Sequence, residues 1–418
     1  MQADQEPQQH VKILLHSIFF APTLTGVGKY TGEMAEWLAS RGHEVRVVTA
    51  PPYYPEWQVA PGYRAGRYST ERLAGVQVWR CPLWVPARPS GARRLLHLAS
   101  FATSSFPVMV RQLVWRPDVV WVVEPPLFCA PTAWLVARLC GGRAWLHVQD
   151  YEVDAAFELG LLRGSVVRRI VAVWERGLMR RFDRVSTISQ NMLGLASAKG
   201  VRSDRLVSFP NWADMAVFTP SDGPNPVRES LDIASDKVVA LYSGTMGRKQ
   251  GLELLAQAAA QMRDVSGVVF VFSGDGAGRE ELIALCDGLP NVRFLHLQPL
   301  ERLGALLGMA DIHLMPQQAG AADLVMPSKL TGMLASGAPV VATCAEGTEL
   351  ARVVRDRGLV VPPSDVDAFV MAIRRLAEDT QQRLRLGANA RDYARQHLSR
   401  DQVLTAFEEA LEKALGSS

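Results

Sequence analysis

The chain has 418 residues, a length typical of two or three domains. Hydrophobic residues make up 48% and charged residues 21% of it, which excludes a mostly disordered chain, a collagen and a coiled coil. The net charge of +3 is too small to indicate a nucleic-acid-binding protein, but it is unevenly spread. Residues 1–213 carry 25 Lys and Arg against 16 Asp and Glu, and residues 214–418 carry 20 against 26. A basic half joined to an acidic half predicts two domains with different partners.

Cysteine usage and hydropathy indicate the compartment. Five cysteines are scattered without a close pair, which favours reduced thiols in the cytoplasm over a disulfide framework or a zinc site. The polar start, MQADQEPQQH, does not have the pattern of a signal peptide. The most apolar stretch, 119–140, is interrupted by Glu124, two prolines and Arg138, so it predicts no membrane-spanning helix. We therefore expect a soluble protein or one attached to a membrane surface.

The first half alternates β-branched segments with amphipathic ones. Strands are predicted over residues 11–17, 44–49, 118–122, 143–148 and 184–188, and a helix over residues 29–40. Such alternation is typical of a parallel sheet with helices on both faces.

The same alternation restarts at Lys237. Strands are predicted over residues 238–243, 268–273, 292–295, 311–315 and 339–342, and a helix over residues 249–263. Residues 210–235 contain four prolines and few apolar side chains, which indicates a linker. We predict an α/β fold of two doubly wound, Rossmann-like domains with a ligand cleft at the carboxyl ends of both sheets. The predicted parts are a first domain over 1–212, a linker over 213–236, a second domain over 237–396, and a C-terminal helix over 397–418 that returns to the first domain.

A cationic, aromatic insert interrupts the first domain. Residues 72–117 contain seven arginines and no Asp or Glu, together with tryptophan and phenylalanine side chains. This composition fits an interfacial membrane element, and it equally fits a core helix with a solvated basic face. A predicted helix over 165–181 adds five arginines that would extend the same surface.

Two glycine turns are candidate phosphate sites. Gly26-Val27-Gly28 follows the first strand and opens a helix, where free N–H groups and the helix dipole favour an anion. The alternative is a turn that merely joins strand to helix. The full dinucleotide fingerprint is absent, because Thr31 stands at its third glycine position, so we predict no nicotinamide site.

The second turn, Gly244-Thr245-Met246-Gly247, is followed by Arg248 and Lys249. Cations at a helix start oppose the helix dipole, so their presence there needs a reason. A bound diphosphate supplies one, and two solvated surface charges are the alternative.

His147 lies at the end of a predicted strand, and Asp150 follows it. A polar group in this place points into the cleft of a parallel sheet, and an imidazole there can move a proton or donate to a substrate oxygen. A structural histidine bonded to Asp150 is the alternative. No D-x-D sequence and no His/Cys cluster with metal-binding spacing occurs, so we predict a mechanism without a metal or other cofactor.

Several segments, taken in order, resemble the retaining nucleotide-sugar glycosyltransferases of family 4, which have the GT-B fold. They are the Gly26–Gly28 loop, His147 after its strand, VSTIS (185–189), FPNWAD (209–214), SGTMGRKQG (243–251), FSGDG (272–276), ADIHLMP (310–316) and SGAPVVAT (336–343). The resemblance covers about the whole chain. It implies a GT-B enzyme that transfers a hexose from a nucleotide sugar, with residues 1–212 as the acceptor domain and residues 237–396 as the nucleotide-sugar domain.

Three longer segments are similar to bacterial exopolysaccharide glycosyltransferases of the colanic acid type. They are TGVGKYTGEMAEWLASRGHEVRVVTAPPYYPEW (25–57), WLHVQDYEVDAAFELG (145–160) and AADLVMPSKLTGMLASGAPVVAT (321–343). This similarity implies a GDP- or UDP-linked donor such as GDP-fucose. It implies a lipid-diphosphate-linked saccharide as acceptor, at the inner face of the bacterial plasma membrane, with no nucleic-acid partner.

The resemblance also implies the site residues. Those expected in catalysis are His147, Arg248, Lys249 and Asp150. Those expected to bind the donor are Gly26, Val27, Gly28, Gly244, Thr245, Gly274, Asp275, Gly276, Asp323, Leu324, Val325, Met326, Ser328 and Lys329.

Two departures from the family pattern leave other functions open. The two glutamates of the family align with Leu324 and Gly332, so Asp323 or Lys329 would replace them, and the family's arginine position holds Thr245, with Arg248 nearby. A nucleotide-sugar 2-epimerase and a non-catalytic nucleotide-sugar-binding partner are the alternatives.

Overall fold

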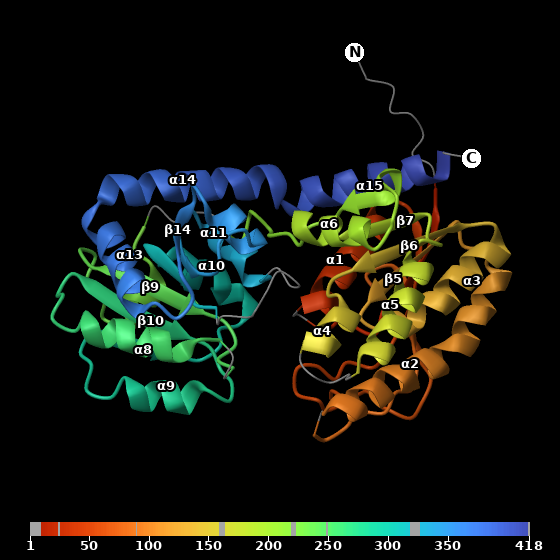
Figure 1. The fold of residues 1–418 in the computed structure, drawn as a ribbon, viewed down its shortest axis with the longest axis horizontal. Helices are drawn as coiled ribbons and strands as arrows, with labels where there is room; N and C mark the ends of the chain where they lie inside the picture. The colour runs from red at the N-terminus through yellow and green to blue at the C-terminus, as the bar shows by residue number, and fades with distance from the viewer. Residues whose placement is uncertain are drawn as a thin grey trace, which may run out of the picture. The chain divides into compact units, whose positions relative to one another are not determined.

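The computed structural model describes residues 10–23, 26–88, 90–158, 164–218, 223–247, 250–317 and 327–416. The chain divides into two compact units, Met1–Pro210 with Leu404–Ser418, and Asn211–Val403. Each unit is a largely parallel sheet covered by helices (Figure 1), which confirms the predicted pair of Rossmann-like α/β domains.

The first sheet has the strand order β3-β4-β2-β1-β5-β6-β7-β8. Only the pair β3–β4 is antiparallel among its described strands, so the carboxyl ends of β1, β2, β5 and β6 share one edge. The strands are β1 (Lys12–His16), β2 (Glu44–Thr49), β3 (Ser69–Leu73), β4 (Val76–Arg80), β5 (Val119–Glu124), β6 (Arg143–Val148), β7 (Arg184–Thr187) and β8 (Leu206–Ser208).

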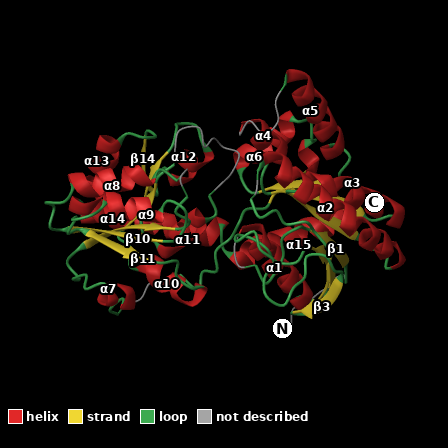
Figure 2. Ribbon diagram, turned by 90° about the horizontal axis from the view of Figure 1, so that it is seen from below, coloured by secondary structure: helices red, strands yellow, loops and turns green. Residues whose placement is uncertain are grey.

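Helices cover both faces of this sheet (Figure 2). The crossovers that contain α2, α3 and α5 all step in one direction along the strand order, and the crossover with α1 steps in the other. Right-handed connections therefore place α2, α3 and α5 on one face and α1 on the opposite face. The helices are α1 (Gly26–Ser40), α2 (Gly91–Arg111), α3 (Ala130–Cys140), α4 (Glu152–Glu158), α5 (Ser165–Met179), α6 (Gln190–Ala198) and α15 (Arg400–Gly416).

Residues 72–117, predicted to form an insert, belong partly to the sheet. β4 lies between β3 and β2, and Arg80 at its end is buried and donates to the Glu71 carboxylate at 2.6 Å. The prediction overlooked this arginine's partner because Glu71 immediately precedes the acid-free segment. The remainder of the segment is mostly α2, whose Phe101 and Met109 are buried in the core.

The second sheet is parallel throughout its described strands, in the order β11-β10-β9-β12-β13-β14. Its strands are β9 (Val238–Ser243), β10 (Val268–Ser273), β11 (Val292–Leu295), β12 (Ile312–Met315), β13 (Val340–Thr343) and β14 (Gly358–Val361). Its helices are α7 (Pro226–Ser230), α8 (Leu252–Gln261), α9 (Arg279–Leu285), α10 (Leu300–Gly308), α11 (Lys329–Ser336), α12 (Glu349–Val354), α13 (Val366–Glu378) and α14 (Thr380–His397).

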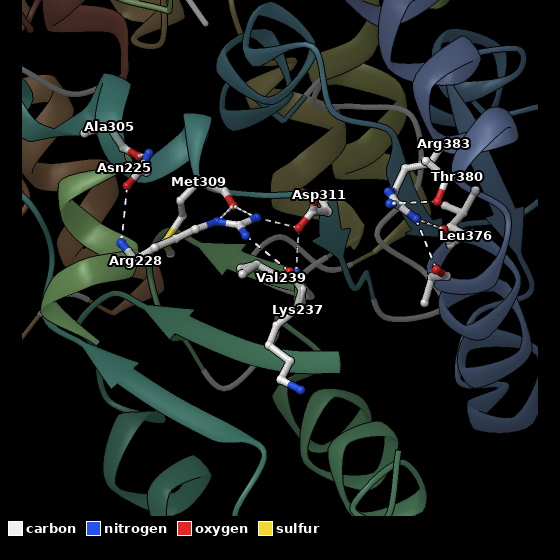
Figure 3. A network of polar contacts seen from close by, with 11 residues as sticks. Asn225, Arg228, Lys237, Val239, Ala305, Met309, Asp311, Leu376, Thr380 and Arg383 are labelled. Carbon is white, nitrogen blue, oxygen red and sulfur yellow. Dashed lines mark hydrogen bonds and ion pairs between the residues drawn. The ribbon is translucent and has the colours of Figure 1, made fainter. Parts of the chain in front are cut away.

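The segment predicted as a linker, 213–236, is instead built into the second unit. Its short helix α7 is capped by Asn225, and Val227 is buried in the core. Arg228 donates to the carbonyl of Met309 at 2.7 Å and to the Asp311 carboxylate at 2.5 Å (Figure 3). The prolines misled the prediction, because one of them begins a helix, where a missing N–H costs nothing.

The C-terminal helix α15 crosses from the second unit to the first. Its start is anchored in the second unit, where Arg400 donates to the carbonyl of Ala213 at 3.0 Å. From Leu404 onwards it belongs to the first unit, where Phe407 stacks on Phe209 with ring centroids 4.5 Å apart. Glu408, which is buried, accepts a hydrogen bond from His43 at 2.9 Å. The chain thus passes between the units twice.

Candidate functional site

Two glycine turns pack against each other at the carboxyl edge of the second sheet. Gly244 follows β9, Gly274 follows β10, and both have positive φ. A Cβ atom at Gly274 would stand 1.9 Å from the carbonyl oxygen of Gly244, and one at Gly276 would stand 2.6 Å from that of Met246. These positions therefore require glycine because backbone approaches backbone. Gly244, Gly274 and Gly276 lie at the edge of the sheet where ligands of parallel sheets bind, which agrees with their predicted place beside the donor.

A lysine lies beside the first of these turns. Lys329 is the first residue of α11, and its ammonium sits over the ring of Tyr242, 4.5 Å from the centroid. A Cβ atom at Gly244 would come within 3.5 Å of its side chain. Desolvation lowers the pKa of Lys329 to about 8, and among the described residues no carboxylate pairs with it. A desolvated cation at a helix N-terminus suits an anion such as a phosphate group.

Asp275 holds the loop after β10 in place through hydrogen bonds. Its carboxylate accepts hydrogen bonds from the backbone N–H of Leu297 and from His296, both at 2.8 Å. These bonds, the one from Leu297 foremost, hold the pKa of Asp275 below its ordinary value. The loops after β10 and β11 are thereby tied together, and His296 remains largely exposed. The predicted contact of Asp275 with the donor stays a prediction.

Gly332 explains one departure from the family pattern. A Cβ atom at this position would stand 2.9 Å from a methyl group of Leu307, and the ring of Phe218 lies just beyond it. The position is buried within α11, so a glutamate there would have to displace core side chains. The described geometry therefore has no space at Gly332 for the family's second glutamate.

Several predicted site residues lie outside the described residues. These are Arg248, Lys249, Asp323, Leu324, Val325 and Met326. The helix predicted from residue 249 begins at Leu252, because Gly251 has φ +66 and takes the N-cap position. Thr245 is described, and its carbonyl accepts a hydrogen bond from the Tyr242 hydroxyl at 2.8 Å. Ser328 is the N-cap residue of α11.

In the first unit, the Gly26-Val27-Gly28 segment forms the first turn of α1, three residues earlier than predicted. Gly28 has a packing role, because a Cβ atom there would lie 2.8 Å from Cβ of Thr23. Gly26 differs, since it has φ +54 and open space where a Cβ would stand. The open space at Gly26 and the positive end of the α1 dipole suit a ligand anion.

His147 is enclosed within the sheet. It is 1% exposed, its ring stacks on Trp121 with centroids 5.1 Å apart, and Ser186 bonds its Nδ1 at 2.9 Å. The amide of Gln149 bonds its Nε2 at 3.0 Å. Burial lowers the pKa of His147 to about 3, so the ring is neutral at physiological pH. This geometry favours the structural alternative, with Ser186 and Gln149 as partners in place of Asp150.

Asp150 is better placed for chemistry. It follows the carboxyl end of β6 and is half-buried. Desolvation, and after it the charge of Glu152, raise the pKa of its carboxyl to about 7, and the charge of Arg94 opposes this rise. A carboxylate that titrates near neutral pH can accept a proton from a hydroxyl. Of the two predicted groups at the end of this strand, Asp150 is the less buried.

No three His, Cys, Asp or Glu side chains gather as a possible metal site in the described part of the chain. Likewise, no described helix is long and apolar enough to cross a membrane. Metal independence stays a prediction.

Comparison with known proteins identifies the family. Residues 25–212 match the glycosyl transferase 4-like domain, and residues 225–393 match glycosyl transferases group 1. The chain is 45% identical over 410 residues to WcaI of Escherichia coli (strain K12), whose name describes it as a colanic acid biosynthesis glycosyl transferase. That alignment covers 95% of this chain and 98% of WcaI.

The chain therefore belongs to the glycosyltransferases that combine a glycosyl transferase 4-like domain with a glycosyl transferases group 1 domain. A mannosyltransferase from Mycobacterium tuberculosis, named as GDP-mannose-dependent, is 26% identical over 91% of this chain and 93% of its own. The fold of the glycosyltransferase is shared with sucrose-phosphate synthase of Thermosynechococcus elongatus, with a TM-score of 0.75 at 16% identity, over 97% and 99% of the two chains. Anabaena HepE, solved with UDP, gives a TM-score of 0.68 at 16% identity, over 96% and 100%. These likenesses confirm the predicted GT-B fold.

Proposed function

We propose that this glycosyltransferase moves a hexose from a GDP- or UDP-linked donor to a lipid-linked saccharide in exopolysaccharide biosynthesis of the colanic acid type. The identity with WcaI supports the pathway. The observation that carries the donor assignment is Lys329, a desolvated ammonium at the start of α11, beside the glycine turn of Gly244. The donor diphosphate binds there, on the second unit.

Transfer breaks the bond between the anomeric carbon and the diphosphate, so negative charge builds on the leaving group. Lys329 and the positive end of the α11 dipole stabilise that charge, and a well-placed donor of this kind contributes ~3–4 kcal/mol to the barrier reduction. Arg248 and Lys249 are further cations for the same role, and no metal is required. The acceptor hydroxyl attacks from the side that the diphosphate leaves, which retains configuration. Its proton passes to the departing phosphate or, alternatively, to Asp150.

We also propose a peripheral attachment to the inner membrane face. Every exposed charged side chain on α2, α3 and α5 is an arginine, and the one acidic residue of these helices, Glu175, is buried against Lys199 at 2.5 Å. Apolar side chains stand exposed between these arginines. They include Leu96, Phe106, Val110, Leu135, Leu139, Val166, Ile170, Val173 and Trp174. Arginines alternating with exposed apolar groups suit an anionic lipid surface.

A transfer assay tests the proposal. The protein is incubated with UDP- and GDP-linked hexoses and a lipid-diphosphate-linked saccharide, with and without a chelator, and the new linkage is assigned by NMR. The proposal expects transfer with retained configuration that survives the chelator, and turnover that falls further than acceptor affinity in Lys249→Ala. Conversion of the donor to its epimer without acceptor indicates an epimerase, and nucleotide binding without transfer indicates a non-catalytic partner.

A further inference from the structure

A cluster of aromatic rings lies at the carboxyl edge of the first sheet. The loop that follows β2 supplies Tyr53, Tyr54 and Trp57, and the loop that follows β1 supplies Phe19. Phe19 stacks on Tyr53 with centroids 5.6 Å apart at 28°, and it meets Tyr54 edge-on at 5.6 Å. Trp57 meets Tyr53 edge-on at 5.8 Å.

The buried side of this cluster is fixed by hydrogen bonds. Nδ1 of His97, on α2, bonds the carbonyl oxygen of Trp84 at 2.6 Å, so Nδ1 carries the proton and Nε2 accepts from the Tyr53 hydroxyl at 2.8 Å. Tyr53 and His97 are both buried. Their rings form a rigid base, and Phe19, Tyr54 and Trp57 present partly or fully exposed side chains above it.

Trp57 is held in an unusual backbone conformation. Its φ of +55 lies in the left-handed region, which bulky residues rarely adopt. Contacts with the rings of Tyr53 and His97 retain it, with the His97 centroid 5.3 Å away. Such strain persists where the surroundings hold it, and it often accompanies a ligand contact.

One cation connects the rings with Asp150. The Arg94 guanidinium, at the start of α2, stands 5.8 Å from the centroid of the Trp57 ring. The same guanidinium acts electrostatically on the carboxyls of Asp150 and Glu152. The edge of the sheet therefore brings together partly or fully exposed aromatic faces, an exposed arginine and the half-buried carboxylate of Asp150.

We infer that this surface, made by Phe19, Tyr54, Trp57 and Arg94, is the acceptor platform of the enzyme and binds an anionic saccharide. Pyranose rings present apolar C–H faces that pack on aromatic rings, and the rigid aromatic side chains lose little entropy on binding. Arg94 binds the anionic group of the same molecule, as guanidinium groups do with phosphate and carboxylate. That group is the lipid diphosphate or a uronate carboxylate. The inference rests on the proposed transferase function.

Saturation-transfer NMR and titration test the platform with three probes: an octyl-diphosphate-linked hexose, methyl glucuronide and a neutral methyl hexoside, each in the presence of UDP and GDP. Trp57→Ala and Tyr54→Ala are expected to weaken both anionic probes at least tenfold, and Trp57→Phe to restore most of the affinity. Arg94→Ala is expected to weaken only the probe whose anion it binds, which identifies the diphosphate or the carboxylate. Nucleotide affinity should be unchanged in all variants.

Arg67→Ala and Tyr68→Ala are the matched controls, because both side chains are exposed in the loop before β3 and lie outside the platform. The inference is overturned if the wild type binds nucleotide but neither anionic probe, or if the Trp57 and Tyr54 variants bind the probes as well as the controls do. Equal weakening of all three probes by Arg94→Ala would also contradict an anion contact. A wild type that binds no nucleotide refutes the proposed function instead.

Discussion

At the scale of the residue, a desolvated lysine that pairs with no carboxylate of the described residues points to an anionic ligand in the second unit. Desolvation of an ammonium is unfavourable, and the ring of Tyr242 offsets only part of it. Lys329 entered the prediction only as a substitute for a missing glutamate. Tyr242 was not predicted at all, although its place at the end of a strand and before a glycine turn was visible in the sequence.

The pKa of Lys329 gives donor binding a definite pH dependence. The ammonium form binds the diphosphate, so affinity for UDP or GDP should fall by about tenfold for each pH unit above about 8, the limiting slope for one proton. Lys329→Arg should remove this fall, because a guanidinium stays charged. Calorimetric titration between pH 7 and 9.5 measures it. Lys237→Arg, which replaces a partly exposed lysine before β9, serves as the control and should keep the wild-type pH profile.

The titration of Asp150 predicts how kcat/KM declines on the acidic side, or acidic limb, of the pH profile. Desolvation raises the pKa of its carboxyl to about 7, and only the ionised form accepts a proton, so kcat/KM should decline as pH falls below about 7. Asp150→Asn should lower kcat/KM by roughly 10²-fold or more and abolish that limb, if Asp150 is the base. The exposed Asp204→Asn variant should behave as the wild type. A limb that persists in Asp150→Asn would assign the proton transfer elsewhere.

At the scale of the element, α2, α3 and α5 form one face of the first unit, on which every exposed charged side chain is an arginine. Composition singled out the segment 72–117, which contains α2, and the predicted helix over 165–181, which corresponds to α5, because both concentrate arginine. It did not predict α3, whose single arginine and apolar residues read as core. Only the crossover geometry shows that α3 shares their face, where Arg181 lies 6.0 Å from the ring centroid of Trp134.

This face predicts binding to anionic vesicles. Replacing Ile170 and Val173 by Gln should weaken partitioning onto phosphatidylglycerol vesicles several-fold, because both side chains are more than 60% exposed and their apolar contact would be lost. Sedimentation with vesicles at two salt concentrations measures it, and salt should weaken the wild type. Met371→Gln, on an exposed helix of the second unit, is the control. If the Ile170/Val173 variant and Met371→Gln partitioned equally onto the vesicles, this face would be ruled out as the membrane-binding surface.

At the scale of the whole molecule, periodicity predicted the strands best. The predicted bounds of β2, β6, β9, β10 and β11 match the structure, because buried parallel strands are continuous apolar segments between polar turns. The segment 213–236 was mistaken because its contacts, such as Arg228 with Asp311, join residues far apart in sequence. The burial of His147 was not predicted for the same reason, and its catalytic role stays a prediction. Its partners, Trp121 and Ser186, come from neighbouring strands.

Three buried histidines make the fold sensitive to acid. Burial lowers the pKa of His16, His147 and His313 to about 3, against about 6.5 when unfolded. The unfolded chain therefore takes up protons that the folded chain does not, and stability is lost as pH falls from about 6.5 towards 3. Thermal unfolding should show a Tm that declines through this window. His313→Gln should flatten the decline in the second unit, whereas the exposed His397→Gln should not change it.

The double passage of the chain between the units has a consequence for biosynthesis. The second unit is one uninterrupted segment, Asn211–Val403, whereas the first needs Leu404–Ser418 to supply Phe407 and Glu408. Domains generally fold in order of emergence from the ribosome, N-terminal first. Here the domain translated first must wait for the last fifteen or so residues (about one helix), so the later domain completes itself earlier. Until then, the rings of Trp145 and Phe209 lack their contact with Phe407 and offer apolar surface to chaperones.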